Sequence, residues 1–500
     1  MPDSDSDATA RLPASVEVTP GGPVEGVIRP PGSKSLTNRA LICAAFAKGR
    51  SELTGALQSE DTKVMIDALR SIGVGIDISD GGKTLVVDGQ RTERQRTERQ
   101  RAETQAAEQQ ATVQADDSGK LQELYVANSG TTVRFLAAAL SAAGGQYRLV
   151  GVERMHQRPI GDLVDALQMV VDGHIQAISP RGCPPVEIRC NGWKGNKLEV
   201  GGSVSSQYLS GLMMAAPLVS QADDSSESGQ GKALLKALST QILVSGELVS
   251  RPYVDMTAKV MQSFGANLSL KDEGLLSEPA LVVEVEGGGY SPTPYEIEPD
   301  ASAASYFWAA AAITGGKVTV QGLSRGAMQG DVGFCEVLEK MGCQVQYDDH
   351  FICVQGHPLQ GVDVDMNEIS DTVQTLAVVA LFASGPTRVR GVAHNRFKET
   401  DRIGDLAREL QKLGATVEEH EDGLTIHPID QSQESPADQK VVIETYHDHR
   451  MAMSLSLAGL RIPGVQIVNP ACTGKTYPEF FADLESLIGR SHHWLASGNH

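Results

Sequence analysis

Positively charged side chains stand where several helices are predicted to begin in this chain of 500 residues. The stretch PGSKSLTNR (31–39) places Lys34 and Arg39 at the start of an apolar helix. Arg450 in HDHR and Lys475 in CTGK occupy similar positions. The N-terminal end of a helix is partly positive, so cations there cost stability unless an anion binds beside them. We therefore predict an anion-binding site that is built from helix starts.

Uncharged polar residues accompany these cations at other predicted helix starts, together with one carboxylate and one histidine. They are Ser35, Asn128, Gly130, Ser205, Ser206, Gln207, Asp371 and His449. Ser, Asn and Asp at such positions most often cap the helix, which is the simpler interpretation of any single one. The basic residues among them favour a ligand-binding role for the set.

Further charged residues fall in compact loops. Arg158 lies in RMHQRPIGD, and Lys398, Glu399 and Arg402 lie in FKETDR. Arginine forks and lysine point charges could together bind two anionic groups at once. Glu399 stands among cations that could tune it as a general acid or base.

Other chemistries do not fit the spacing. GSKS lacks the pattern G-x-x-x-x-G-K-[ST], so no phosphate-binding P-loop is predicted. The two histidines of HDH (447–449) have no third ligand signature nearby, so we predict no metal site. Seven cysteines lie without a C-x-x-C pair, and we expect reduced thiols. Cys472 is more often a passive small residue in such a context than a nucleophile.

The overall composition bounds the class of protein. Hydrophobic residues make up 41% and charged residues 21%, which is typical of a globular chain with a substantial core. The length favours two domains. A formal net charge of −20 should repel nucleic acid and anionic membranes. The acidic N-terminus has no signal-peptide pattern and no apolar run is long enough to span a bilayer, so we expect a cytoplasmic protein.

One pattern recurs six times along the chain: a polar start, an Ala-, Leu- and Met-rich helix, a Gly or Pro break, and a short β-branched strand. A second, more amphipathic helix and a strand follow most copies. This predicts an α/β protein with three repeats in each domain. The first domain is predicted over 34–290, with a polar insertion at 91–120, and the second over 1–33 plus 291–500. The insertion has almost no apolar residues to bury.

Ten ordered motifs resemble those of the 5-enolpyruvylshikimate-3-phosphate synthase family, the 3-phosphoshikimate 1-carboxyvinyltransferases. They run from PGSKSLTNRA through ANSGTTVR, RMHQRPIGDLVDAL, GSVSSQYL, LVSRPYVDMT, DASAASYFWAAAA, MQGDVGF, FKETDRI and YHDHRMAM to CTGKTYPEFF. The resemblance implies the two-domain enolpyruvyl transferase fold, an inside-out α/β barrel in which each domain has three similar βαβαββ-type units.

The resemblance also implies a reaction without a cofactor or a metal. The 5-hydroxyl of shikimate 3-phosphate adds to phosphoenolpyruvate, and the tetrahedral intermediate loses phosphate, as a step toward chorismate and the aromatic amino acids. The expected partners are these two small molecules, with no nucleic acid and no membrane, and a monomer is expected. Glyphosate is the known inhibitor of this family.

Site residues can be carried over position by position. The implied phosphoenolpyruvate contacts are Lys34, Gly130, Arg158, Gln207, Arg402, Arg450 and Lys475. The implied shikimate 3-phosphate contacts are Lys34, Ser35, Arg39, Ser205, Ser206, Gln207, Ser250, Asp371 and Lys398. Asn128, Tyr253 and His449 would support the site. Asp371 would accept the hydroxyl proton, and Glu399, together with Lys34, would protonate the methylene carbon; the sequence leaves open which group serves which step.

Two positions depart from the family pattern. Where the family usually has Asn in N-W-R-x-K-E, this chain reads HNRFKE, which puts His394 at that position and Asn395 one place later. Either residue could contact substrate. Phe135 stands where many bacterial members have Pro, in the neighbourhood that affects glyphosate binding, so inhibitor sensitivity is not predicted.

Two alternative functions use the same fold. One is the enolpyruvyl transferase that acts on a UDP-amino sugar, whose first loop lacks SKSLTNR and which usually depends on a Cys near position 120. This chain has DDSGKLQEL there and no Cys. The other is a non-catalytic anion-binding protein, whose mark would be the loss of Lys34, Asp371, Glu399 or Lys475. All four are present.

Overall fold

A computed structural model of the chain describes residues 13–89, 121–202, 205–219, 239–246, 248–273, 280–430 and 440–496. The segment 91–120, predicted as a polar insertion, lies outside these ranges. The chain divides into two compact units. Unit 1 is Met1–Pro30, Ala301–Ala327 and Asp331–His500, and unit 2 is Pro31–Asp300 and Met328–Gly330. The domain boundaries inferred from the sequence stay a prediction.

The described part of unit 2 contains three four-stranded sheets. In spatial order they are β14 (Pro294–Glu296), β3 (Arg50–Thr54), β5 (Thr84–Asp88) and β4 (Gly75–Ser79); β6 (Gln122–Tyr125), β7 (Gly145–Val150), β9 (Cys183–Trp193) and β8 (Val171–Ser179); and β10 (Lys197–Gly201), β11 (Ser239–Ser245), β13 (Leu281–Glu286) and β12 (Leu268–Asp272). In each sheet the first two strands are parallel and the others antiparallel.

The described part of unit 1 repeats this arrangement. Its sheets are β2 (Glu25–Ile28), β15 (Lys317–Gln321), β17 (Phe351–Gln355) and β16 (Gln344–Tyr347); β18 (Asp363–Asp365), β19 (Thr387–Arg390), β21 (Gly423–His427) and β20 (Thr416–His420); and β22 (Val441–Ile443), β23 (Val465–Val468), β1 (Ser15–Glu17) and β24 (His493–Leu495). Here too the first pair of each sheet is parallel and the rest antiparallel.

Twelve α-helices connect these strands in the described residues. Unit 2 has α1 (Lys34–Ala45), α2 (Glu60–Ser71), α4 (Gly130–Ala143), α5 (Gly161–Gln168), α6 (Ser206–Ala215) and α7 (Arg251–Ser263). Unit 1 has α8 (Ala301–Thr314), α9 (Phe334–Lys340), α10 (Val373–Ala380), α11 (Gly404–Lys412), α12 (His449–Ser456) and α13 (Phe480–Ile488). Short 3₁₀ turns are η1 (Asp80–Gly82), η2 (Glu153–Gln157), η3 (Ala216–Leu218), η4 (Gly330–Gly333), η5 (Asn367–Thr372), η6 (Ala393–Phe397), η7 (Leu457–Leu460) and η8 (Pro470–Lys475).

Strands and helices combine into the predicted βαβαββ units. The order β6, α4, β7, α5, β8, β9 forms one repeat, with the last strand placed between the second and the third. Three repeats borrow a strand from far along the chain. Strand β14 completes the sheet of β3, β2 completes that of β15, and β1 lies between β23 and β24. Chain segments that are distant in sequence therefore close each unit.

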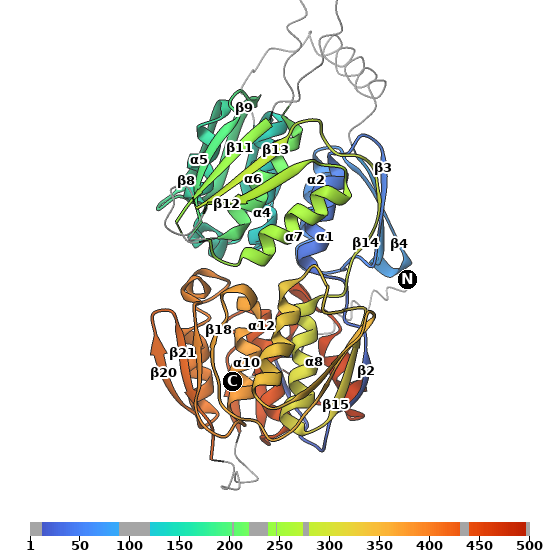
Figure 1. Ribbon diagram of the computed structural model, residues 1–500, viewed down its shortest axis with the longest axis vertical. Helices are drawn as coiled ribbons and strands as arrows, with labels where there is room; N and C mark the ends of the chain where they lie inside the picture. Colours follow the sequence, from blue (N-terminus) through green and yellow to red (C-terminus); the bar gives the residue numbers. More distant parts are fainter. Residues whose placement is uncertain are drawn as a thin grey trace, which may run out of the picture. The chain divides into compact units, whose positions relative to one another are not determined.

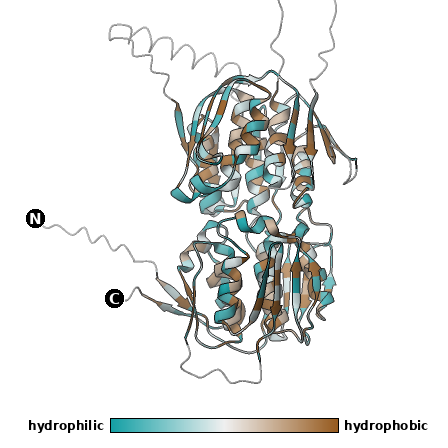
Figure 2. Cartoon of the chain, turned by 90° about the vertical axis from the view of Figure 1, so that its left-hand side faces the viewer, coloured by the Kyte–Doolittle hydropathy of each residue, from teal (hydrophilic) through white to brown (hydrophobic). Residues whose placement is uncertain are grey.

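The first helix of each repeat is buried on nearly all faces, whereas the second has an exposed face. Every residue of α10 is buried, but α11 buries only one side. Helices α8, α10 and α12 lie side by side in the interior of unit 1, with β20 and β21 on one flank and β15 and β2 on the other (Figure 1). Hydrophobic residues recur along the strands and helices (Figure 2), and almost every residue of α8, α10 and α12 is buried. Burial all round is what the Ala- and Leu-rich composition predicts.

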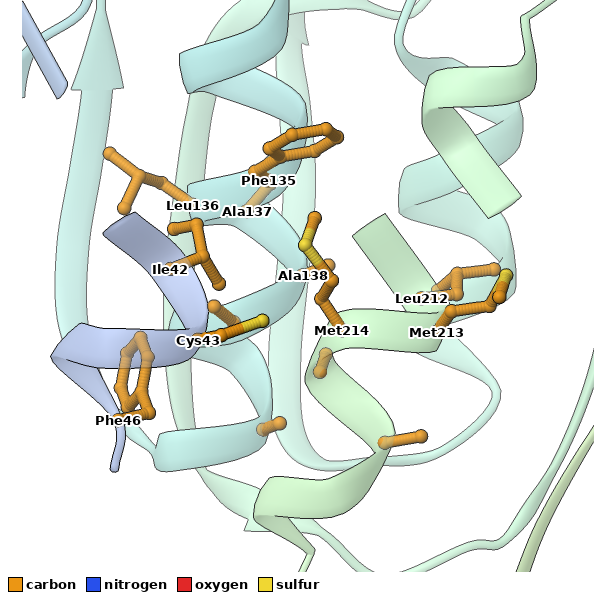
Figure 3. Packing of buried hydrophobic residues seen from close by; sticks show 14 of the residues in the cluster. Ile42, Cys43, Phe46, Phe135, Leu136, Ala137, Ala138, Leu212, Met213 and Met214 are labelled. Atoms are coloured by element: carbon orange, nitrogen blue, oxygen red, sulfur yellow. The ribbon is translucent and has the colours of Figure 1, made fainter. Parts of the chain in front are cut away.

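The core of unit 2 joins the first helices of its three repeats. Figure 3 shows Ile42 and Cys43 of α1, Phe135 and Ala138 of α4, and Met214 of α6 packed in one cluster of buried side chains. Small residues on α4 let neighbouring helices approach closely. This packing fixes the helix starts, which carry the candidate site residues. No helix among the described residues has the length and apolar character needed to cross a bilayer.

Candidate active site

The sequence-predicted residues of unit 2 lie at the starts of α1, α4, α6 and α7. Lys34 and Gly130 are the first residues of α1 and α4, Ser206 is the first of α6, and Ser250 directly precedes α7. The remaining residues follow within the first turns or, for Asn128 and Arg158, lie in the adjoining loops. Because these four helices pack against one another, their starts belong to one framework.

Helix capping explains why some of the polar residues stand at the helix starts. The side chains of Ser33, Ser129 and Ser205 accept hydrogen bonds from the first-turn amides of α1, α4 and α6, and Asp448 does the same for α12. Ser205 is therefore a helix cap in this structure. A capping hydroxyl keeps a second lone pair, so capping and ligand contact are compatible.

Left-handed backbone precedes α4, α7, α12 and η8. Seven non-glycine residues of the described chain have positive φ, and five of them lie just before candidate-site helices: Ala127, Ser250, Tyr446, His447 and Asn469. Such conformations cost on the order of 1–3 kcal/mol each and persist only where the surrounding structure enforces them. Here they turn the chain sharply so that the cap and the first turn of each helix follow at once.

An arginine pair flanks Gly130 in unit 2. Nη1 of Arg158 donates to the backbone oxygen of Asn128 at 2.9 Å and to its side-chain oxygen at 3.3 Å. On the other side, Nη1 of Arg134 donates to Oε1 of Gln207 at 2.6 Å. A Cβ on Gly130 would lie 2.4 Å from Nη2 of Arg158 and 3.0 Å from Nη1 of Arg134. Glycine is thus the residue that lets two guanidinium groups flank this helix start.

Arg39 is almost fully buried and is held by neutral groups. Its Nε donates to the Thr257 hydroxyl at 2.7 Å and its Nη1 to the Ser35 carbonyl at 2.9 Å. Its guanidinium carbon lies 5.2 Å from the centre of the Phe135 ring and 5.9 Å from that of Tyr253. Burial lowers the pKa of Arg39 to about 10, so the side chain stays charged at neutral pH. The hydrogen-bond partners of Arg39 are neutral, so they leave its positive charge uncompensated, which favours a nearby anion.

Lys34 is the least enclosed cation of the unit 2 group. Its Nζ lies 3.6 Å from a carboxylate oxygen of Asp61, and its side chain is 13% exposed. Its backbone amide donates to Asp300 at 3.3 Å. A contact at this length is a loose ion pair, which an anionic ligand could displace.

The predicted residues of unit 1 form a connected network of charges. Arg402 donates from Nη1 to Asp371 at 3.2 Å and from Nη2 to Glu399 at 2.9 Å. Asp371 also accepts from Nη2 of Arg450 at 2.7 Å, and Glu399 also accepts from Nζ of Lys475 at 2.9 Å. Each candidate acid or base is therefore bonded to two cations.

Asp448 anchors the centre of this network. Its oxygens accept from Nε of Arg402 at 2.7 Å and from Nη2 at 3.2 Å, and its Oδ1 accepts from the amide of Arg450 at 2.8 Å. Burial by itself lowers the pKa of Arg402, but the charges of Asp448, Glu399 and Asp371 more than offset it, so that this pKa is raised. Arg402 is a permanent, rigid cation.

His394 and Asn395, the two candidates for the family's Asn position, are both buried in η6. Burial, with the nearby charge of Lys398, lowers the pKa of His394 to about 3 against the opposing charge of Asp371. Asn395 donates through Nδ2 to the Ser370 carbonyl at 3.0 Å. Asn395 thus ties the η6 loop to the residue that precedes Asp371, and His394 is neutral beside Asp371.

Two other predicted residues of unit 1, His449 and Lys398, and the cysteine Cys472 lie outside the bonds described above. His449 is buried at the start of α12, with Nδ1 3.7 Å from Asp448. Lys398 ends η6. Burial raises the pKa of Cys472 to about 12, so its thiol is protonated at neutral pH. No group of three or more His, Cys, Asp or Glu side chains in the described ranges is arranged to hold a metal ion.

The sequence interpretation missed two charged residues of these groups, Arg134 and Asp61. Arg134 ends the motif ANSGTTVR. The sequence indicates Asp448 only as a residue at a helix start in HDHR, and its pairing with Arg402 is seen in the structure. The signal that could have found these residues is charge at positions that the apolar pattern marks as buried, since a buried charge needs partners. Their partners lie far along the chain.

Comparison with known proteins identifies a family with a similar sequence. The family model described as EPSP synthase (3-phosphoshikimate 1-carboxyvinyltransferase) matches residues 18–484. The 3-phosphoshikimate 1-carboxyvinyltransferase of Shewanella loihica is 39% identical over 473 residues, which cover 94% of this chain and 99% of that protein. That of Serratia proteamaculans is 40% identical over 477 residues, 95% of this chain and 98% of that one.

Solved structures share the fold. An EPSP synthase from Acinetobacter baumannii superposes with a TM-score of 0.70 at 24% identity, covering 96% of this chain and 98% of that one. The enolpyruvyl transferase NikO from Streptomyces tendae gives a TM-score of 0.67 at 17% identity, covering 97% and 99%. These likenesses confirm the predicted two-domain α/β fold of the enolpyruvyl transferases.

Replacing Gly130 by alanine should displace the neighbouring guanidinium groups rather than unfold the protein. The new Cβ meets the ends of two flexible side chains, and the backbone there is ordinary helix. We expect phosphoenolpyruvate, the anion that the sequence resemblance assigns to Arg158, to bind about ten-fold more weakly or worse, as the loss of one charged hydrogen bond predicts. Calorimetric titration measures this. Gly22→Ala, where a Cβ meets nothing within 4 Å, is the control, and equal affinity in both variants would contradict the geometry.

Replacing His394 by asparagine should flatten the acid side of the stability profile. The folded pKa of about 3 lies below the ordinary 6.5, so below pH 6.5 the unfolded chain takes up a proton that the folded chain does not. The free energy of unfolding therefore falls as pH drops, with a limiting slope of about 1.4 kcal/mol per pH unit from this group. His394→Asn should lose stability less steeply between about pH 6 and 4.

Urea denaturation at several pH values measures that slope. The matched control is His174→Asn, which changes an exposed histidine of β8 and should leave the wild-type slope in place. Identical slopes for wild type and His394→Asn would mean that His394 gains its proton in the folded protein.

Proposed function

The chain belongs to the EPSP synthase (3-phosphoshikimate 1-carboxyvinyltransferase) family, and from this premise we propose that it transfers the enolpyruvyl group of phosphoenolpyruvate to the 5-hydroxyl of shikimate 3-phosphate and releases phosphate. The observation that carries the residue roles is the unit 1 charge network. In it the two carboxylates expected to move protons, Asp371 and Glu399, are each bonded to two cations expected to bind phosphoenolpyruvate.

The reaction needs two proton movements in its first step. The 5-hydroxyl oxygen bonds to C2 of phosphoenolpyruvate while its proton leaves and a proton is added to the methylene carbon C3. In the second step C3 loses a proton and the C2–O bond to phosphate breaks, which restores the enol ether. Asp371 is the proposed acceptor of the hydroxyl proton. Glu399, acting together with Lys34, is the proposed donor to the methylene carbon.

The proposed substrate contacts divide by unit. In unit 2 the phosphoenolpyruvate contacts are Lys34, Gly130, Arg158 and Gln207, and the shikimate 3-phosphate contacts are Lys34, Ser35, Arg39, Ser205, Ser206, Gln207 and Ser250. In unit 1 they are Arg402, Arg450 and Lys475 for the first substrate, and Asp371 and Lys398 for the second. The cations in both sets suit ligands that carry a phosphate and a carboxylate.

Pairing between cations and carboxylates shapes how phosphoenolpyruvate would bind. Arg450 and Lys475 are less than a tenth exposed, and each already contacts a carboxylate. Substrate oxygens would share these donors with Asp371 and Glu399, which brings the reacting carbon next to both carboxylates. Holding two reactants in this way can supply on the order of 7–11 kcal/mol of the barrier reduction. The same cations would stabilise the departing phosphate.

We also propose that the enzyme is monomeric and cytoplasmic. The acidic composition and the sequence resemblance support it. Sedimentation of the purified chain and fractionation of cells that express it would test the two parts separately.

The function is tested by phosphate release from phosphoenolpyruvate with and without shikimate 3-phosphate, together with mass spectrometry of the organic product. The expected result is release only when both substrates are present, with the carboxyvinyl ether of shikimate 3-phosphate as product. Release that instead requires a UDP-amino sugar would assign the alternative transferase. If the folded protein releases no phosphate with shikimate 3-phosphate or with a UDP-amino sugar, it would be a non-catalytic anion-binding protein.

Lys34→Met and Glu399→Gln should each abolish turnover while the protein stays folded. The first removes a cation proposed to contact both substrates, and the second removes a proton donor but keeps its size. Removing a general acid or base typically costs 10²–10⁴-fold. Circular dichroism checks the fold, and initial rates check activity.

Two exposed substitutions are the controls for these variants. Lys259→Met on α7 and Glu336→Gln on α9 make the same chemical changes at exposed positions and should keep the wild-type rate. Near-normal turnover by either site variant would remove the role assigned to that residue.

A further inference from the structure

Arg134 is a nearly buried arginine of α4 that the sequence resemblance assigns to neither substrate. It is 5% exposed and stands one turn after Gly130. Its Nη1 donates to Oε1 of Gln207 at 2.6 Å, a short and strong contact between two repeats of unit 2. Gln207 is the proposed contact of both substrates, and its side chain is half-buried.

This contact fixes which end of the Gln207 amide faces where. A guanidinium group has only donors, so the amide oxygen must be the end that faces Arg134. The amide nitrogen then points the other way, where Nε2 lies 3.3 Å from the hydroxyl of Thr131. Thr131 is the second residue of α4, next to Gly130. The donor end of Gln207 is thus directed at the same helix start as Arg158.

Arg134 itself is held in place by unit 2. Its Nη2 donates to the Pro159 carbonyl at 3.1 Å, and its guanidinium carbon lies 5.2 Å from the centre of the Tyr208 ring. The Tyr208 hydroxyl donates to the same carbonyl at 2.7 Å. Pro159 follows Arg158 directly in the chain. One carbonyl therefore links the position of Arg134 to the loop that carries Arg158.

We propose that Arg134 is a positioning residue, which locks the Gln207 amide so that its Nε2 is presented as a hydrogen-bond donor to the substrates. The proposal rests on the proposed function, because it uses Gln207 as a substrate contact. A rotatable amide could present its oxygen to an anion, and that orientation repels phosphate and carboxylate oxygens. Arg134 removes this orientation.

A double-mutant cycle tests the proposal. Arg134→Met, Gln207→Met and the double variant are compared in kcat/KM for phosphoenolpyruvate. Arg134→Met should cost about ten-fold or more, the scale of one charged hydrogen bond. It should cost less than two-fold once Gln207 is already Met, because its effect passes through that amide. Losses that multiply would show that Arg134 acts independently of Gln207, as a structural role or a direct charge effect would, and would overturn the proposal.

Two further variants serve as a fallback and a control for this test. Arg134→Lys keeps the positive charge and loses the planar fork, so it serves if the Met variant does not fold, and its loss should likewise vanish in the Gln207→Met background. Arg325→Met is the matched control. Arg325 also lies over an aromatic ring, Tyr347, but its side chain is 64% exposed, and its replacement should leave kcat/KM unchanged.

A crystal structure of Arg134→Met separates this proposal from the proposed function. Gln207 should leave its position against Thr131 or turn its oxygen toward it. A Gln207 side chain that stays in place, with Nε2 still on Thr131, would overturn the positioning role whatever the activity. If the wild-type protein shows no turnover while Gln207 moves in the variant, the proposed function fails and the positioning role stands.

Discussion

The buried guanidinium of Arg402 is the constraint on which unit 1 depends. A charge that is 2% exposed needs partners, and Asp448, Glu399 and Asp371 supply three carboxylates from three separate segments of the chain. Those segments are the loop before α11, the start of α10 and the cap of α12. Removing Arg402 would leave the fully buried carboxylate of Asp448 without its guanidinium partner, which is commonly destabilising by several kcal/mol. The same ion network therefore connects these segments of unit 1 and orients Asp371 and Glu399, its candidate base and acid.

Unit 2 solves the problem of buried cations differently. Arg39, Arg134 and Arg158 are bonded to carbonyl, hydroxyl and amide oxygens, and Arg39 and Arg134 also lie over aromatic rings. Neutral partners satisfy the hydrogen bonds but leave the positive charge in place. Helix starts beside these arginines add to the same sign of potential. In a protein with a net charge of −20, this produces a local preference for anions that the overall composition would oppose.

Much of the site could be located from the sequence because its signals are local. Lys34 and Arg450 stand out as cations at helix starts, whereas Lys475, which was also predicted at a helix start, is the last residue of the 3₁₀ turn η8. Cys472 could be set aside because a lone Cys beside a basic residue is more often a passive small residue. The departures at HNRFKE were visible but not interpretable. His394 and Asn395 are adjacent, and only their surroundings distinguish them: His394 is neutral beside Asp371, whereas Asn395 is tied to the Ser370 carbonyl. Arg134 was within a quoted motif, yet nothing near it in sequence indicates Gln207, which follows 73 residues later.

The sequence by itself determined the six repeats, their helices and strands, the capped helix starts and the cations on them, because hydrophobic period, caps and turns act over a few residues. The tertiary structure alone decided how each unit closes, with β14, β2 and β1 completing sheets from distant parts of the chain. It also decided the left-handed turns at Ala127 and His447, since their cost is met by packing around them. The pairing of Asp371 with Arg450, 79 residues apart, belongs to the same class. Contacts of that length depend on the folded packing as a whole, which no local pattern encodes.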